Sequence, residues 1–261
     1  MTENEGKSTV SRRKKILEKL NADGHIYVKE LSESLGVTGV TIRNDLIKLE
    51  KKRLLIRARG GAMKVEQNYP GVDYPLSEKQ KKHHAEKREI GKRAALLIEN
   101  DNTIILDSGS TTFEVAKNLA KFDSLTVITN ALNVATYLAE FKNINVVVPG
   151  GTLRKNSLSL VGIVAEKGFK DYFCDKLFLG VDGFDPLHGI STPNLEEAHL
   201  NQIMIEISRE VIVVTDSSKF QRRGFAFISA INKVNTVVTD KDISAEDVAK
   251  LESAGIKVII V

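Results

Sequence analysis

The sequence predicts an α/β protein in two parts: a small helical module over residues 1–63 and a larger domain over residues 86–261 with a mainly parallel sheet. Two observations predict this class. In the first part, apolar residues recur at the spacing of amphipathic helices. In the second part, short runs of β-branched residues alternate with helical stretches, as in sheets that are covered on both faces. A chain of 261 residues is long enough for two cores.

The N-terminal module contains three predicted helices. The first spans residues 12–21, the second spans residues 28–36, and the third begins at Thr38, which is suited to be its N-cap. Residues 54–63, LLIRARGGAM, form a β-prone run that leads into a Gly-Gly turn. Three helices with a tight turn before the last one, followed by a hairpin, indicate a winged helix-turn-helix.

A linker is predicted over residues 64–85. This stretch has no helical periodicity, and it holds two of the five prolines together with many charges. His83 and His84 have no partners at the spacing of metal ligands, which favours exposed histidines over a metal site. We expect no metal and no cofactor.

The larger domain contains seven predicted strands, each a short apolar run. Helical stretches separate them, so a mainly parallel sheet is expected. The runs are 103–106, 125–129, 144–148, 176–181, 211–215, 236–239 and 257–261.

Charge is unevenly distributed along the chain. Residues 1–64 hold 15 Lys and Arg against 8 Asp and Glu, a net charge of +7, whereas the remaining 197 residues hold 23 against 26, a net charge of −3. A basic head favours contact with a polyanion, although a solvated basic surface is the alternative. Cys174 is the only cysteine, so we expect a buried, inert thiol. The sequence has neither a leader peptide nor a membrane span, so we expect a cytoplasmic protein.

The third predicted helix has two distinct faces. Ile42, Leu46 and Leu49 share the face that is expected to pack on the other helices. The other face is polar, and in a helix-turn-helix its N-terminal half enters the major groove, where Asn and Arg match base edges and Lys neutralises phosphates. A polar face that only meets water is the alternative. The residues expected to bind DNA are Thr38, Val40, Thr41, Arg43, Asn44 and Lys48, with Arg57 and Arg59 on the wing.

Polar side chains follow five of the predicted strands, at the edge where open parallel sheets bind ligands. The stretch DSGSTT places hydroxyls at a helix start, which favours an anion, and Lys219 is suited to pair with phosphate. Polar turns end strands in any α/β protein, which is the alternative to a site for a phosphorylated polyol. The candidate ligand residues are Asp107, Ser108, Gly109, Ser110, Thr111, Thr112, Gly150, Gly151, Asp182 and Lys219.

The N-terminal module resembles the DNA-binding domain of the DeoR family of bacterial repressors. That family has a Val-Thr/Ser-x-x-Thr-Ile-Arg-x-Asp-Leu third helix and an Arg-x-x-Gly-Gly wing. Here these motifs stand as Val37 to Leu46 and as Arg57 to Gly61. The resemblance implies that Thr41, Arg43 and Asn44 face DNA.

The larger domain resembles the sensor domains of the same family. ILDSGSTT, TN, PGG, LGVDGF and TDSSKF occur in the family's order. Such sensors are similar to ribose-5-phosphate isomerase, which implies a sugar phosphate surrounded by Asp107 to Thr112, Gly150, Gly151, Asp182 and Lys219. The resemblance adds Thr129, Asn130 and Gly183 to the candidate ligand residues.

An isomerase with an added DNA-binding head is the alternative function. DGFD resembles the isomerase Asp-Gly-Ala-Asp turn, with Asp182 and Asp185 in place. The isomerases follow that turn with a Lys-Gly-Gly-Gly loop, whereas PLHGISTPNLEEAHL has no lysine. Glu196 and Glu197 remain as possible bases. We expect a loop rebuilt for binding, and no enzyme.

At a finer level, TIRNDL, LFLGVD, STPNLEEAHLN and VVTDSSKF resemble repressors of N-acetylgalactosamine and galactosamine catabolism. This implies an amino-sugar phosphate as the effector, although hexitol and ketose phosphates stay open. The predicted function is a repressor of a sugar-catabolism operon that a phosphorylated sugar releases from double-stranded operator DNA. Two half-sites would need a homo-oligomer, either a dimer or a tetramer.

Overall fold

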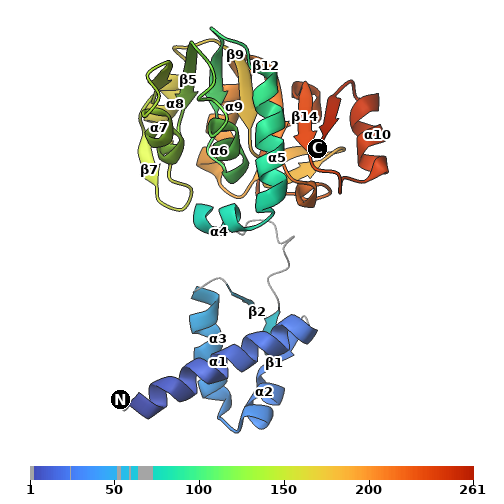
Figure 1. Cartoon of the computed structure of the whole chain (residues 1–261). Helices are drawn as coiled ribbons and strands as arrows, with labels where there is room; N and C mark the ends of the chain where they lie inside the picture. Colours follow the sequence, from blue (N-terminus) through green and yellow to red (C-terminus); the bar gives the residue numbers. More distant parts are fainter. Residues whose placement is uncertain (1–2, 24, 52–53, 59, 64–72) are drawn as a thin grey trace. The chain divides into compact units, whose positions relative to one another are not determined.

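Two units make up the chain, Met1–Tyr69 and Pro70–Val261. The computed structural model describes residues 3–23, 25–51, 54–58, 60–63 and 73–261 (Figure 1). No helix in these ranges is long and apolar enough to cross a membrane.

The first unit is a winged helix-turn-helix, as predicted. Its three strands form an antiparallel sheet in the order β1-β3-β2. The hairpin of β2 and β3 is the predicted wing, whereas β1 lies between the first two predicted helices, where no strand was predicted. The elements are α1 (Glu3–Asp23), β1 (His25–Tyr27), α2 (Val28–Leu35), α3 (Gly39–Lys51), β2 (Ile56–Ala58) and β3 (Gly61–Met63).

A buried carboxylate ties two helices of the first unit together. Asp45 on α3 is 2% exposed. It accepts hydrogen bonds from Arg12 Nε at 2.6 Å and Arg13 Nε at 2.7 Å, both on α1. These contacts lie beside an apolar core that includes Ile16 and Leu46. Arg12 and Arg13 therefore contribute to the fold as well as to the basic charge of the unit.

The second unit is built on a seven-stranded sheet in the order β15-β14-β12-β9-β4-β5-β6. All neighbouring strands in it are parallel. Each strand coincides with a predicted apolar run to within three residues at either end. The strands are β4 (Thr103–Leu106), β5 (Leu125–Thr129), β6 (Ile144–Val147), β9 (Cys174–Leu179), β12 (Ser208–Val214), β14 (Thr236–Thr239) and β15 (Lys257–Ile260).

Helices cover both faces of this sheet (Figure 1). Side chains alternate between the faces along each strand, so Ile105 joins one apolar core while Ile104 and Leu106 join the other. Residues of α5, α6 and α7 complete the second core, and residues of α8, α9 and α10 complete the first. The helices are α5 (His84–Ala94), α6 (Ser110–Ala116), α7 (Leu132–Leu138), α8 (Ile163–Phe169), α9 (Leu195–Glu206) and α10 (Ala245–Ser253).

Two small antiparallel sheets and three 3-10 turns extend this framework, and none of them was predicted. One sheet is the hairpin of β7 (Thr152–Arg154) and β8 (Ser159–Val161). The other has the order β10-β11-β13, with β10 (Gly183–Asp185), β11 (Gly189–Thr192) and β13 (Ala226–Ser229). The 3-10 turns are η1 (Ala95–Leu97), η2 (Ser217–Lys219) and η3 (Ile231–Lys233).

The predicted linker, residues 64–85, differs from the structure over its second half. Residues 64–72 lie outside the described residues, but residues 73–85 belong to the second unit. They include α4 (Leu76–Lys81) and the first residues of α5. The sequence signal was weak because α4 is short and buries only Leu76 among its side chains. His83 and His84 are exposed, as expected.

The Asp45 contacts give the first prediction. Asp45→Ala should lower the unfolding free energy of the first unit by about 2 kcal/mol, because it leaves two arginines without their carboxylate. Arg12 and Arg13 keep some contact with solvent, so the loss of unfolding free energy is smaller than it would be for a fully buried ion pair. Chemical denaturation followed by far-ultraviolet circular dichroism would measure it. Asn44→Ala is the control, since Asn44 is exposed on the same helix. Equal stability of the two variants would contradict the prediction.

Candidate functional site

The third helix of the first unit is capped as its sequence predicts. Thr38 Oγ1 accepts a hydrogen bond from the backbone nitrogen of Thr41 at 3.2 Å, and its hydroxyl lies 3.0 Å from that of Thr41. Ile42, Leu46 and Leu49 are buried in the core of the unit. The opposite face of α3 is therefore the one that remains open.

That open face carries most of the residues predicted to bind DNA. Val40 is 62% exposed, although it is a large apolar side chain. Thr41 is half-buried. Arg59 lies outside the described residues, and only the backbone of Arg57, in β2, is described. Exposed residues on or next to α3 are Thr38, Val40, Arg43, Asn44 and Lys48.

In the second unit, Asp107 occupies the point where the chain leaves β4. The neighbouring strands β4 and β9 are the place where the strand order reverses, which is where open α/β sheets form a ligand crevice. Asp107 is 3% exposed, and its Oδ2 accepts from the backbone nitrogen of Gly180 at 3.3 Å. Burial raises the pKa of the Asp107 carboxyl well above its usual range, and the nearby Glu197 carboxylate raises it further.

Glu197 joins this crevice to the β7–β8 hairpin. Its Oε1 accepts from Arg154 Nη1 at 2.9 Å and from the Ser159 hydroxyl at 3.1 Å. The Thr192 hydroxyl lies 3.5 Å from Oε2 of Glu197. With the Asn201 amide nitrogen turned toward the acceptors, it donates to Asp107 Oδ1 at 3.2 Å and to the backbone oxygen of Glu197 at 3.3 Å. The Glu197 carboxylate is thus held by a cation and hydroxyls.

Asp182, at the end of β9, collects two ammonium groups. Its Oδ2 accepts from Lys79 Nζ at 2.8 Å, and its Oδ1 lies 3.9 Å from Lys219 Nζ. Burial by itself would raise the pKa of Asp182, but Lys79 and Lys219 outweigh it, and the pKa is lowered. For Lys79, burial opposes the charged form, yet the Asp182 carboxylate raises its pKa overall. Asp182 and Lys79 are therefore both charged at neutral pH.

A third lysine is buried next to this group. Lys87 on α5 donates to the backbone oxygens of Lys79 at 2.6 Å and Lys82 at 2.7 Å. Its Nζ lies 4.0 Å from Asp216 Oδ2. Burial lowers the pKa of Lys87 to about 8, although Asp216 acts in the opposite direction. Lys87 fastens the C-terminal part of α4 to α5.

Several predicted ligand residues have structural roles in the second unit. The Thr129 hydroxyl donates to the backbone oxygen of Leu106 at 2.7 Å and accepts from the nitrogen of Ala131 at 3.0 Å. A Cβ on Gly151 would lie 2.9 Å from the Cβ of Ala165, which is too close, so this position has no room for a larger side chain. A Cβ on Gly183 would lie 2.6 Å from the Ser191 hydroxyl, so this glycine permits close packing of β10 against β11.

The remaining predicted residues divide between the crevice and the neighbouring hairpin. Ser108 and Gly109 are half-buried beside Asp107, whereas Ser110, Thr111 and Thr112 are buried in the first turn of α6. Asn130 is buried and donates to the backbone oxygen of Leu160 on β8 at 3.4 Å, while its Oδ1 has no partner. Gly150 has open space around it apart from Val164. α6 has only seven residues, so its N-terminus attracts an anion weakly. The lysine ammonium groups attract an anion more strongly.

The residues that the sequence did not predict for this site are Lys79, Lys87, Arg154, Thr192 and Asn201. Lys79 lies within the predicted linker, which has no periodic pattern, and Lys87 lies two residues after it, so nothing in the sequence indicated that they fold against the sheet. Arg154 lies three residues after the PGG motif, and this cation close to two glycines was the available signal. Arg154 also donates to the Ser157 hydroxyl at 2.8 Å and forms an ion pair with Asp73.

Two of the residues considered for isomerase chemistry, Glu197 and Asp185, are engaged by hydrogen-bond donors. Glu196 is exposed at the start of α9, and Glu197 carries the contacts described above. Asp185 accepts from Arg223 Nε at 2.7 Å and lies 3.1 Å from His188 Nδ1. Burial would raise the pKa of Asp185, but the Arg223 hydrogen bond and the other donors lower it.

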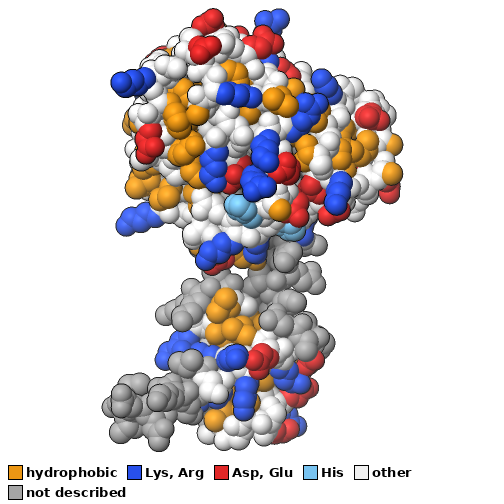
Figure 2. Space-filling model, in the orientation of Figure 1, with side chains coloured by type: hydrophobic (Ala, Val, Ile, Leu, Met, Phe, Trp, Pro, Cys, Tyr) orange, Lys and Arg blue, Asp and Glu red, His pale blue; other side chains and the backbone are white. Residues whose placement is uncertain are grey.

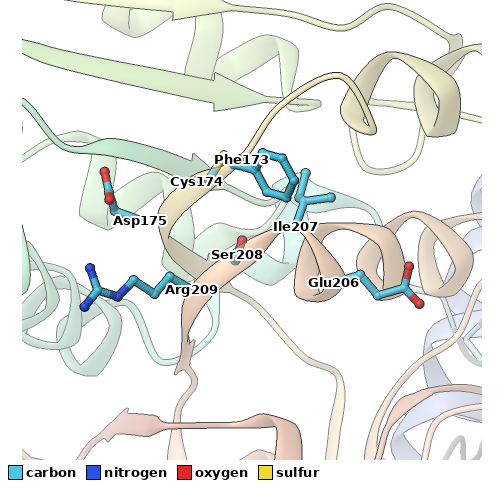
Figure 3. Close-up of a pocket in the computed structure, with 7 residues that line it drawn as sticks. All are labelled: Phe173, Cys174, Asp175, Glu206, Ile207, Ser208 and Arg209. Carbon is cyan, nitrogen blue, oxygen red and sulfur yellow. The ribbon is translucent and has the colours of Figure 1, made fainter.

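A shallow pocket of about 330 Å³ lies at the opposite end of the sheet, where β9 and β12 begin (Figure 3). It is lined by residues 173–175 and 206–209. Phe173 is 90% exposed, and Cys174 is buried. Burial raises the pKa of the Cys174 thiol to about 12, so the thiol is unreactive, as expected. Ligands of parallel sheets bind at the carboxyl ends of the strands, so this pocket is not the candidate site.

The fold and these surfaces define a class of protein: a DNA-binding transcriptional regulator with a separate sensor domain. The model of the DeoR-like helix-turn-helix domain matches residues 12–68, and that of the DeoR C-terminal sensor domain matches residues 82–241.

A proposed aga operon transcriptional repressor from Escherichia coli O157:H7 is 40% identical over 253 residues, which cover 97% of this chain and 94% of the relative. The transcriptional regulator GlpR from Haloferax volcanii is 34% identical, covering 95% and 96%. The chain belongs to the DeoR family of transcriptional repressors. Among solved structures, ribose 5-phosphate isomerase A from Methanocaldococcus jannaschii is similar, with a TM-score of 0.40, 16% identity, and coverage of 53% of this chain and 55% of that one.

The buried lysine gives the second prediction. The folded chain releases the Lys87 proton near pH 8, whereas the unfolded chain keeps it to about pH 10.5. The unfolded state binds more protons in this window, so stability rises with pH there. Relative to Lys87→Met, the wild-type chain should gain up to about 3 kcal/mol between these limits. Denaturant titrations at a series of pH values would measure the difference. A wild-type curve parallel to that of Lys87→Met would contradict a titrating Lys87.

Proposed function

We propose that this chain represses a sugar-catabolism operon and that a phosphorylated sugar, bound at the carboxyl edge of the sheet, releases it from operator DNA. The observation that carries the proposal is the placement of lysine ammonium groups on Asp182, beside the hydroxyl-rich stretch after β4. Lysine favours phosphate, and carboxylates and hydroxyls favour sugar hydroxyls. Figure 2 shows basic and acidic side chains interspersed on the visible face of this unit, so that face is not uniformly basic.

The effector that we propose is an amino-sugar phosphate. The motifs quoted from the sequence support it, and so does the similarity to a relative named for the aga operon. A buried carboxyl at Asp107 and the Glu197 carboxylate offer acceptors for an amine or for hydroxyls of the sugar. Hexitol and ketose phosphates are the competitors within the same class.

On the DNA side, we propose that α3 enters the major groove and that the wing contacts the adjacent backbone. Arg43 and Asn44 would bind base edges, and Lys48 would bind phosphate. Two such heads on a dimer or tetramer would contact two half-sites in the cytoplasm. The proposed DNA-binding set is Thr38, Val40, Thr41, Arg43, Asn44, Lys48, Arg57 and Arg59.

A sugar-phosphate isomerase reaction is not favoured. A general base needs a free lone pair close to the substrate. Oε1 of Glu197 instead accepts hydrogen bonds from Arg154 and Ser159, so this oxygen is already engaged by donors of the chain.

Base recognition gives the third prediction. Arg43→Ala should weaken operator binding 10- to 100-fold, which corresponds to about 1–3 kcal/mol for one base contact. It should leave binding to non-specific DNA nearly unchanged. Gel shift at two salt concentrations would measure both. Lys14→Ala is the control, because it removes a charge from an exposed position on α1. An equal loss of operator binding in both variants would mean that Arg43 contributes only its positive charge and does not recognise a base.

Effector binding gives the fourth prediction. In a thermal-shift panel of sugar phosphates, a ligand at 100 times its Kd should stabilise the wild-type chain by about 2.7 kcal/mol. The double variant Thr111→Ala, Lys219→Ala should lose this shift and the release from DNA but keep operator binding. Lys233→Ala, at an exposed position in η3, is the control. If the double variant no longer binds the operator, the two residues support folding or assembly instead.

A further inference from the structure

One side of the second unit exposes large apolar side chains. α7, α8 and β7 lie on the left of this unit in Figure 1, and hydrophobic side chains gather there in Figure 2. Ile163 and Val164, in the first turn of α8, are 68% and 65% exposed, and Leu195, at the start of α9, is 52% exposed. With three residues of the β6–β7 connection and the hairpin, they form what we call the apolar patch: Val148, Leu153, Leu158, Ile163, Val164 and Leu195.

Close packing holds the segments of the patch together. A Cβ on Gly150 would lie 3.8 Å from Cγ1 of Val164, so the connection after β6 lies against α8. A Cβ on Gly162 would lie 3.8 Å from Oε1 of Glu196, so the starts of α8 and α9 are neighbours. The hairpin adjoins both helices, because β8 contacts α8 and α9. The six side chains therefore lie on adjoining segments and form one surface.

The β7–β8 hairpin has a polar inner face and an apolar outer face. Its strands pair Arg154 with Ser159, and the next pair is Leu153 with Leu160. Directly opposed residues of an antiparallel pair project to the same face, and successive pairs alternate between the faces. Arg154 and Ser159 both donate to Glu197 in the crevice, so the leucine pair faces outward. One hairpin therefore borders both the candidate effector site and the apolar patch.

The segment that carries most of the patch is poor in charge. Charged residues make up 28% of the chain, but residues 144–165 hold only two, Arg154 and Lys155. Arg154 is already paired with Glu197 and Asp73. The centre of a protein interface is depleted of charge in the same way. Exposed isoleucine, valine and leucine without charge between them are therefore typical of a surface that another molecule covers.

Charged residues of both signs border the patch. On α8, Glu166 and Lys167 lie one turn after the exposed apolar pair. Lys155 follows β7, and Glu196 lies in the first turn of α9. None of these four side chains has an ion pair within the part of the chain that the structure describes. Contact of the patch with a second copy of itself would let the lysines of one copy face the glutamates of the other, whereas a partner of one charge would be repelled by half of this rim.

The size of the patch also suits a contact between two copies. Six large apolar side chains, each about half exposed, amount to on the order of 500 Å², comparable to the largest apolar patch on a typical monomer. A stable dimer buries about 800 Å² on each partner, with an apolar centre and a polar rim. The patch would supply the centre, and the four bordering charges would belong to the rim.

We propose that the apolar patch is an interface between two copies of this chain related by a two-fold axis. The inference deepens the proposed function and rests on it only for the requirement that two DNA-binding heads act together. The first turn of α8 and the outer face of the β7–β8 hairpin form the centre of the interface. Because the inner face of the same hairpin holds Glu197, the interface lies next to the candidate effector site.

The first experiment measures the mass of the full-length protein by analytical ultracentrifugation. The double variant Ile163→Asp, Val164→Asp places two carboxylates of each copy in the interface, and the two-fold axis doubles the effect. Both positions lie in the first turn of α8, where aspartate is compatible with a helix. Phe225→Asp is the matched control, because Phe225 is also 65% exposed but lies next to β13. Far-ultraviolet circular dichroism verifies that each variant is folded.

The wild type should sediment as a dimer or a tetramer. The double variant should sediment at half that mass, with a dissociation constant at least 100-fold higher, whereas Phe225→Asp should change the constant less than threefold. A folded double variant that keeps the wild-type mass overturns the inference. A halved mass in Phe225→Asp alone would place the interface beside β13 and overturn it as well.

The second experiment does not depend on disrupting the interface. Leu195→Cys introduces a thiol into the patch, and the native Cys174 is buried and unreactive. Maleimide should label this thiol at least tenfold more slowly than the thiol of Phe225→Cys, although the two positions have similar exposure in the single chain. Equal labelling rates in the assembled protein would show that the patch is open, which would overturn the inference.

The outcomes separate this inference from the proposed function. Neither measurement uses DNA or an effector, so loss of the interface claim leaves operator binding and sugar-phosphate binding as they were. If the wild type is a monomer, the interface and the proposed oligomer fail together, while the effector site stands. If the double variant keeps its mass but loses operator binding, the patch contacts the DNA-binding unit instead of a second copy, and the inference is overturned.

Discussion

The reversal of strand order between β4 and β9 is the constraint on which the second unit depends. After β4 the chain adds β5 and β6 on one side, then crosses to add β9, β12, β14 and β15 on the other. Right-handed connections then require the helices of the two halves to cover opposite faces. The segments that follow β4 and β9 diverge at this point, and Asp107 and Gly180 meet between them. Asp107, Asp182 and Lys219 gather at the same edge because each follows a strand of the parallel sheet, and parallel strands all end there.

A network of buried charges at this edge contributes less to stability than an apolar core of the same size would. Desolvation offsets most of the attraction between buried partners, and replacing such networks with apolar residues is often neutral or stabilising. Arg154, Glu197 and Asp182 are therefore difficult to explain as stabilising elements alone. The side-chain amide oxygen of Asn130, Oδ1, is buried without a partner in the described part of the chain, and this is also a cost to the fold. These costs support a site kept for binding.

The sheet was predictable because its strands are continuous apolar runs, which leave few alternatives to burial on both faces. The small sheets were not, because β7, β10 and β1 have only three residues each and no apolar run. Polar turns such as DSGSTT indicated the correct edge of the sheet. They could not indicate that the Thr129 hydroxyl bonds the neighbouring strand or that Lys79 meets Asp182, because pairing across 103 residues has no local signature.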